Sequence, residues 1–245
     1  MNMNFYIVII GTEILNNRRQ DKHFKFAQNE LAKYGHEIFA SFVIKDDRLL
    51  IENSYKMIQQ DKDAVIFSFG GIGSTPDDLT REIAAKVFTS KPLKRHKTFE
   101  KDIIEKFKEE AYPHRIHMAD LPQGAQLLFN PVNNMSGFSL KKRFFFVPGF
   151  PNMAHPMIAN VIEKYFSLSL QNYRYTLLAE TSENTLIDVM KTLPSSVELS
   201  SLPMFVDNKA KVELSLSGKD QLELQKYFQL FEQKLQSLEI PYALT

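Results

Sequence analysis

Three glycines and two adjacent carboxylates stand close together in residues 67–80, FSFGGIGSTPDDLT. Three of the chain's 9 glycines fall within four positions, and Asp77 and Asp78 follow them. Glycine has no Cβ, so such a loop can turn sharply and bring several N–H groups to one point, where an anion binds. A helix that begins near Pro76 or Asp77 would add its free N-terminal amides. The segment therefore predicts a phosphate site.

The carboxylate pair has two interpretations. Thr75, Asp77 and Asp78 are all good helix N-caps, and the glycines could simply form a tight turn between a strand and a helix. One cap is sufficient, however, and a second acid beside an anion is repulsive unless a cation lies between them. A Mg²⁺ ion that bridges Asp78 to a phosphate reconciles the two groups.

Two other segments place polar residues directly after apolar runs. IIGTEIL contains Gly11 and Glu13, and VIKDDRL contains Asp46 and Asp47. Ligands of open α/β sheets bind beyond the carboxyl ends of the strands, so these residues and the glycine loop are expected at one rim. The alternative interpretation makes Asp46 a plain helix cap and Glu13 a solvated turn residue.

The elements that must position these residues alternate between short apolar runs and amphipathic segments. Strands are predicted at 5–10, 38–44, 64–69, 126–129 and 143–147, and helices at 21–34, 46–60, 79–88, 97–111 and 153–166. This alternation predicts a doubly wound, largely parallel α/β sheet over residues 1–168. Residues 169–245 read β-α-β-β-α-β, with a turn at Asp207 and Asn208, which predicts a smaller ferredoxin-like α+β domain that supports assembly or shapes the edge of a site.

Composition excludes several classes of function. The 245 residues are 44% hydrophobic and 24% charged, as in a globular protein with a sizeable core. A net charge of +1 provides no general attraction for nucleic acid or an anionic membrane. The absence of cysteine excludes disulfides and thiol chemistry. Apolar runs are far shorter than the roughly 20 residues of a membrane span, and no basic signal region begins the chain. We therefore expect a cytoplasmic protein.

Five separated segments resemble one known family. IGTEIL, VIKDDRL, GGIGSTPDDLT, NPVNNMSGF and VPGFPNMAHPM, in this order, resemble the N-terminal domain of the competence/damage-inducible protein A (CinA) family, which has the MoaB/Mog molybdopterin-binding fold. The resemblance covers roughly residues 5–166, and the remainder looks like the small α/β domain that follows in that family. The amidase domain that many CinA proteins carry next is expected to be missing.

The resemblance implies a phosphorylated nucleotide or pterin as ligand, with Mg²⁺, or Mn²⁺ or Co²⁺, at the acids. The implied metal ligands are Asp78, Asp77 and Asp46, and the implied catalytic residues are Asp78, Asp46 and Glu13, with Glu13 orienting the attacking water. The implied ligand-binding residues are Gly11, Thr12, Gly70, Gly71, Gly73, Ser74, Thr75, Ser136, Gly137, Pro148 and Gly149. Proteins of such folds are often homo-oligomers, which we also expect here.

Three functions remain open on this basis. CinA-like N-terminal domains are associated with hydrolysis of the pyrophosphate in ADP-ribose, which makes a metal-dependent nucleotide pyrophosphatase the leading hypothesis. Mog-type relatives adenylylate molybdopterin with ATP, so a molybdopterin-binding or adenylylating protein of molybdenum cofactor biosynthesis is the second. A non-catalytic binding module is the third. Ser74 replaces a proline of the family pattern, Met153 a glutamate and His23 an asparagine, and these departures keep the third hypothesis open.

Other polar residues support weaker interpretations. Arg18 and Arg19 could neutralise a ligand phosphate or form a solvated basic loop. His114 and His117 have metal-like spacing on a predicted strand, but no third ligand stands near them, so we interpret them as surface residues.

Overall fold

The computed structural model describes residues 3–167, 172–206 and 209–245. Two compact units divide the chain, Met1–Ser169 and Leu170–Thr245. The predicted turn at Asp207 and Asn208 lies outside the described residues.

The first unit is built on a six-stranded sheet with the strand order β2-β1-β3-β8-β7-β6. Its strands are β1 (Asn4–Ile10), β2 (Ile38–Ile44), β3 (Ala64–Phe69), β6 (Gln126–Leu128), β7 (Gly137–Leu140) and β8 (Phe144–Val147). β1 runs parallel to β2 and β3, and β8 runs parallel to β3, whereas β7 is antiparallel to β6 and β8. A separate two-stranded ladder pairs β4 (Leu93–Arg95) with β5 (Asp120–Pro122). The parallel part matches the prediction of a largely parallel sheet.

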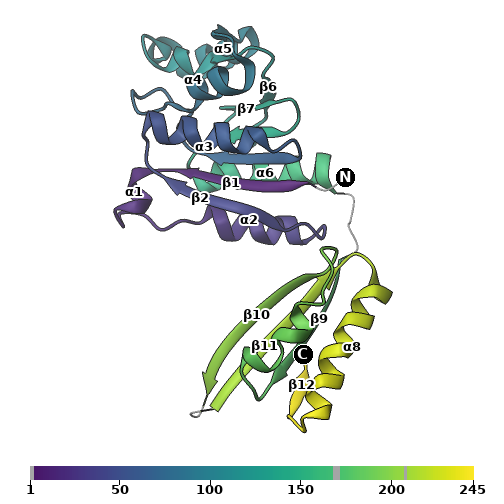
Figure 1. Ribbon diagram of the computed structural model, residues 1–245. Helices are drawn as coiled ribbons and strands as arrows, with labels where there is room; N and C mark the ends of the chain where they lie inside the picture. The colour runs from purple at the N-terminus through teal and green to yellow at the C-terminus, as the bar shows by residue number, and fades with distance from the viewer. Residues whose placement is uncertain (1–2, 168–171, 207–208) are drawn as a thin grey trace. The chain divides into compact units, whose positions relative to one another are not determined.

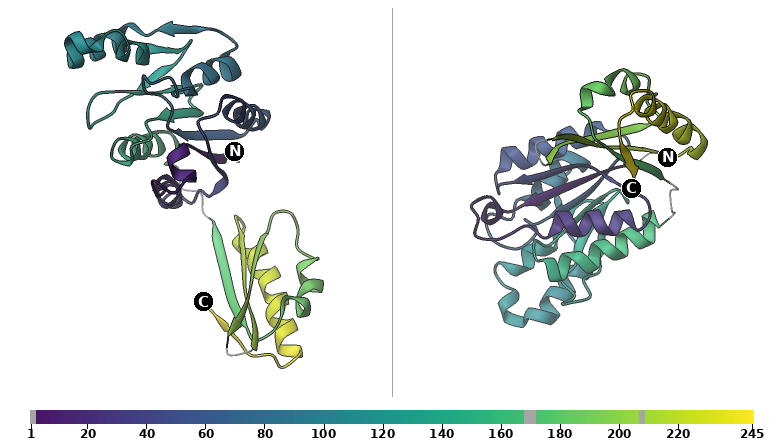
Figure 2. Two further views of the ribbon diagram at one scale, coloured as in Figure 1. Left: turned by 90° about the vertical axis from the view of Figure 1, so that its left-hand side faces the viewer. Right: turned by 90° about the horizontal axis from the view of Figure 1, so that it is seen from below.

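Helices cover both faces of this sheet (Figure 1). Successive side chains of a strand point to opposite faces, so Phe5 and Ile7 pack against α2 (His23–Ala32) and α6 (Pro151–Phe166), which lie side by side in Figure 2. Tyr6 and Val8 belong to the opposite core cluster. That cluster includes residues of α3 (Arg48–Gln60), α4 (Thr80–Ala84) and α5 (Lys97–Phe107). Burial on both faces explains why β1 and β3 are almost uniformly apolar.

Side-chain hydrogen bonds decide where two helices begin. The helix after the glycine loop begins at Thr80, which agrees with the predicted range 79–88 but not with a start near Pro76 or Asp77, because Asp78 bonds back to Thr75 and closes a turn. A π-helical segment, Ala85–Thr89, continues α4. Asp47 caps α3 by accepting a hydrogen bond from the backbone N–H of Leu50, so the interpretation of Asp46 as the cap was wrong.

The segment that holds the two spaced histidines is helical rather than extended. The 3-10 helix η3 (Arg115–Ala119) contains His117, and His114 directly precedes it. The predicted strand at this place was therefore wrong. α5 also ends earlier than predicted, at Phe107, and a 3-10 helix (Lys108–Ala111) follows it.

The second unit has the predicted ferredoxin-like arrangement. Its elements are β9 (Tyr173–Ala179), α7 (Ile187–Met190), β10 (Glu198–Val206), β11 (Lys209–Gly218), α8 (Gln221–Ser237) and β12 (Tyr242–Leu244). The strands form an antiparallel sheet in the order β10-β11-β9-β12. Leu177 and Leu214 share a buried core with Phe228 and Phe231 of α8.

Within the described ranges, no helix is both long and apolar enough to span a membrane.

Candidate phosphate-binding site

The glycine loop begins where three neighbouring strands end. The backbone N–H of Gly70, directly after β3, donates to the carbonyl of Val147 at the end of β8 (3.0 Å). On its other side a Cβ at position 70 would lie 2.3 Å from the carbonyl oxygen of Ile10, and φ of Gly70 is +100°. Both the conformation and the close approach require glycine here.

Four consecutive carbonyls of the loop are held by two residues of α4. The hydroxyl of Thr80 donates to Gly70 O (3.0 Å) and its backbone N–H donates to Gly71 O (3.0 Å). Arg81 donates from Nη1 to the carbonyls of Ile72 and Gly73. In a trans peptide the C=O of one residue is opposed to the N–H of the next. The N–H groups of residues 71–74 therefore point away from Thr80 and Arg81, and they make no hydrogen bond within the described parts of the chain.

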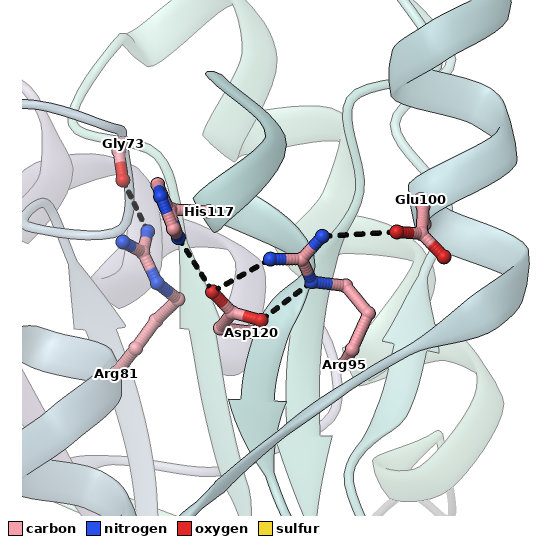
Figure 3. Close-up of polar contacts among 6 residues, drawn as sticks. All are labelled: Gly73, Arg81, Arg95, Glu100, His117 and Asp120. Carbon is pink, nitrogen blue, oxygen red and sulfur yellow. Dashed lines mark hydrogen bonds and ion pairs between the residues drawn. The ribbon is translucent and has the colours of Figure 1, made fainter. Parts of the chain in front are cut away.

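Arg81 was missed by sequence reasoning, although it organises the loop. Its side chain is only 8% exposed, and burial lowers its pKa while Asp78 and Asp120 oppose that effect. Figure 3 shows its guanidinium directed at the carbonyl of Gly73. The sole sequence signal for this role is an arginine in the first turn of the helix that follows the glycines. Such an arginine is ordinarily solvated, and its burial depends on the fold.

Asp78 folds back onto the loop that it follows. Its Oδ2 accepts hydrogen bonds from the backbone N–H (2.8 Å) and the hydroxyl (2.7 Å) of Thr75. A Cβ at position 73 would lie 2.5 Å from the same oxygen, so glycine at this position leaves room for the carboxylate. Oδ1 accepts no hydrogen bond from the residues that the structure describes.

A cavity of about 400 Å³ lies beside the four N–H groups, and we call it the loop cavity. It brings together eight of the predicted residues: Gly71, Gly73, Ser74, Thr75, Asp78, Ser136, Pro148 and Gly149. Much of its remaining wall is apolar, from Ile72, Phe99, Phe107, Met118, Met135, Phe150 and Met153. This volume and lining are typical of a site for a small organic ligand.

A second cavity of about 780 Å³ adjoins it, and we call it the charged cavity. The two cavities share Ser74, Thr75, Asp78 and Arg115. The rest of the charged cavity is lined by Arg48, Pro76, Leu79, Arg81, Glu82, Glu110, Tyr112, His114 and His117. A ligand that crosses the loop at residues 74–75 can therefore occupy both cavities.

Residues 6–167, which include the lining of both cavities, match the family model described as "Probable molybdopterin binding domain". The chain belongs to this family. It is also similar to the "CinA-like protein" of Acaryochloris marina, with 28% identity over 250 residues. This alignment covers 97% of the chain and 59% of the relative, so the chain spans less than two thirds of that protein's length.

The solved structure of one CinA protein agrees with this assignment. A crystal structure described as "the protein CinA with unknown function" from Thermoplasma acidophilum aligns at 27% identity with a TM-score of 0.59, covering 66% of this chain and 97% of that one. The tungsten cofactor synthesizing protein MoaB of Pyrococcus furiosus aligns at 18% identity with a TM-score of 0.42, covering 66% and 91%. The predicted resemblance to CinA and the molybdopterin-binding fold are confirmed.

Several predicted residues of this family domain form a separate cluster. The backbone N–H and the hydroxyl of Thr12 both donate to Asp46 Oδ2 (2.8 Å each), which ties the end of β1 to the end of β2. Glu13 lies 3.6 Å from Arg19, whose guanidinium stands over the ring of Phe150 at 5.4 Å.

None of Gly11, Thr12, Glu13 and Asp46 lines either cavity. Two more predicted residues lie elsewhere, since Asp77 is exposed beside the loop and Gly137 is buried at the start of β7.

The acids fit one mode of divalent-metal binding and not another. The described part of the chain holds no group of three or more His, Cys, Asp or Glu side chains that could enclose a metal ion. Mg²⁺ is, however, commonly bound by one or two carboxylates together with the phosphates of a substrate. Asp78 fits that mode, because it lines both cavities and its Oδ1 accepts no hydrogen bond from the described residues.

Proposed function

We propose that this CinA-like chain is a metal-dependent pyrophosphohydrolase that cleaves a nucleoside diphosphate sugar such as ADP-ribose. The observation that carries the proposal is the row of N–H groups at residues 71–74, which is left open because Thr80 and Arg81 bind the carbonyls of residues 70–73. Consecutive backbone N–H groups of this kind form an anion-binding concavity. A diphosphate offers several oxygens in a row, which matches a row of donors.

The two cavities suit the two halves of such a substrate. Phe99, Phe107 and Phe150 give the loop cavity an apolar, aromatic wall that accommodates a planar base. The charged cavity, on the other side of the shared loop residues, accommodates the second half. The diphosphate then lies between the halves, along residues 71–74, of which Ser74 lines both cavities.

Hydrolysis of this bridge needs mainly position and charge stabilisation. The oxygen of a water molecule bonds to one phosphorus, the bond from that phosphorus to the bridging oxygen breaks, and the protons of the water pass to the product phosphates and solvent. AMP and ribose 5-phosphate result. Donors fixed before the reaction stabilise charge on the phosphoryl oxygens without reorganisation, and the loop N–H groups would serve this purpose. A divalent metal held by Asp78 and the phosphates would neutralise further charge.

The test is release of AMP from ADP-ribose by the purified protein with Mg²⁺, Mn²⁺ or Co²⁺, with ATP as a comparison substrate. We expect metal-dependent AMP formation that falls by about 100-fold or more in Asp78→Asn. Asp63→Asn is the matched control, because Asp63 is an exposed acid before β3, at the opposite end of that strand. Absence of AMP with all three metals would refute the proposal.

The family description favours a second candidate, binding or adenylylation of molybdopterin. The same loop could hold the phosphate of a pterin, and the same aromatic wall could hold its ring. A fluorescent pterin that co-purifies with the protein, or transfer of AMP from ATP to molybdopterin, would support this candidate. Neither result is expected of a dedicated ADP-ribose hydrolase.

A further inference from the structure

We propose that His117 binds the sugar of the ligand half that occupies the charged cavity, by accepting a hydrogen bond from a ribose hydroxyl at Nε2. The inference rests on the proposed function, because it takes a nucleoside diphosphate sugar as the ligand. It assigns a sugar-recognition residue on the wall that faces the glycine loop.

The orientation of the His117 ring is set by a carboxylate. Nδ1 of His117 lies 2.8 Å from Oδ2 of Asp120. An ionised carboxylate only accepts hydrogen bonds, so Nδ1 carries the hydrogen. Nε2 of the neutral ring is then an acceptor, and no described residue donates a hydrogen bond to it. His117 itself lines the charged cavity.

Asp120 is in turn held rigidly by the β4–β5 ladder. Arg95, its cross-strand partner, donates from Nε to Oδ1 (2.5 Å) and from Nη2 to Oδ2 (3.1 Å), and also binds Glu100 (2.9 Å). Burial alone would raise the pKa of Asp120, but hydrogen bonds from Arg95 and His117 lower it. Figure 3 shows the continuous chain from Glu100 to His117. An exposed histidine is thus held by a partly buried network, which is the arrangement that a binding residue needs.

The charge balance of this cavity favours a sugar over a phosphate. Three arginines line it, and three carboxylates, Asp78, Glu82 and Glu110, balance them. Each arginine has a partner, since Arg48 binds Glu82 (2.9 Å), Arg115 binds Glu110 and Arg81 binds loop carbonyls. A nearly neutral wall of donors and acceptors suits hydroxyl groups, whereas the phosphates find unpaired donors at residues 71–74.

His114 provides a matched control in the same cavity. It precedes η3, is exposed and lines the cavity, but its ring makes no hydrogen bond with the described residues. The side chain of His117 is 60% exposed, so an alanine at either position should leave folding intact, which thermal unfolding of both variants checks.

The experiment compares ADP-ribose with ADP, which lacks the distal ribose, by calorimetry at pH 8 with EDTA so that no turnover occurs. The wild-type protein should bind ADP-ribose at least about fivefold more tightly than ADP, since a net hydrogen bond contributes about that factor. His117→Ala should remove most of this preference by weakening ADP-ribose alone, and His114→Ala should keep it. An unchanged preference in His117→Ala, no preference in the wild type, or binding of neither compound would overturn the inference.

The calorimetric comparison and the AMP assay test the sugar contact and the hydrolase proposal separately. A preference for ADP-ribose that depends on His117, without AMP release in the metal assay, would refute hydrolysis and retain the sugar contact. AMP release together with an unchanged preference in His117→Ala would do the reverse.

Discussion

Gly73 and Asp78 lie close together in the candidate site, and their roles can be separated. A Cβ at position 73 would lie 2.5 Å from Asp78 Oδ2, the end of a side chain that can move. Gly73→Ala should therefore displace the carboxylate at a small cost in stability. We expect AMP release to fall by about tenfold or more, because misplacing a catalytic group by about 1 Å can cost on the order of 100-fold.

Gly124→Ala is the control for this prediction. Gly124 has φ of +83° but nothing within 4 Å of an added Cβ, so alanine there costs about 1 kcal/mol of backbone strain without touching the site. In chemical denaturation and the AMP assay, Gly73→Ala should lose activity and little stability. Gly124→Ala should lose stability and keep its activity. Loss of stability without loss of activity in Gly73→Ala would contradict the assigned contact.

At the residue scale, the sequence predicts the glycines and Asp78 better than it predicts the residues around them, such as Arg81 and His117. Glycine at positions 70 and 71 is favoured by positive φ angles, and a short glycine-rich motif reveals such a turn. Arg81 acts by binding the carbonyls of Ile72 and Gly73, and the ring of His117 is oriented by Asp120. Both roles depend on contacts that only the fold creates. The sequence likewise does not reveal that the carboxylate of Asp46 accepts two hydrogen bonds from Thr12.

At the element scale, α2 supports the loop at Pro148–Phe150 through its first residue. His23 is 3% exposed, stacks on Phe69 with ring centroids 4.4 Å apart, and its Nε2 lies 3.2 Å from the carbonyl oxygen of Gly149. Because that oxygen only accepts, Nε2–H donates to it. This contact joins the start of α2 to a loop that lines the loop cavity.

Burial lowers the pKa of His23 from 6.5, which predicts how stability changes with pH. The unfolded chain takes up a proton at His23 near pH 6.5, whereas the folded chain resists it until a lower pH. The contribution of His23 to the free energy of unfolding is therefore fully present above pH 6.5, and it decreases as the pH falls below that value. Burial lowers the pKa of His155 as well, so its contribution has the same sign.

The measurement is chemical denaturation at pH 7.5 and pH 5.5. The wild-type protein should lose stability between these values, and His23→Asn should lose less, since asparagine does not titrate. An equal loss in both proteins would assign the pH dependence to other groups.

The strands were predictable at this scale because continuous apolar runs mark strands covered on both faces. Helix starts were less predictable, because Asp78 and Asp47 each had several possible backbone partners, and the partner decides where the helix begins. The β4–β5 ladder carries only three residues in each strand, too few for a periodic pattern.

At the scale of the whole molecule, each unit has its own hydrophobic core. Every residue that lines the two cavities belongs to the first unit. Residues 1–167 alone should therefore fold and bind ADP-ribose within about twofold of the full chain, which calorimetry on both proteins would show. Weaker binding by the truncated protein would mean that the second unit contributes to the site.

An NMR titration of the full, ¹⁵N-labelled chain with ADP-ribose in EDTA tests directly whether the loop N–H groups bind the diphosphate. We expect the amide resonances of residues 71–74 to shift the most, because these N–H groups bind the diphosphate, while the amide of Gly124 stays in place as a reference. If the ligand binds and the four loop resonances do not move, the phosphates lie elsewhere and the loop is only a turn between β3 and α4.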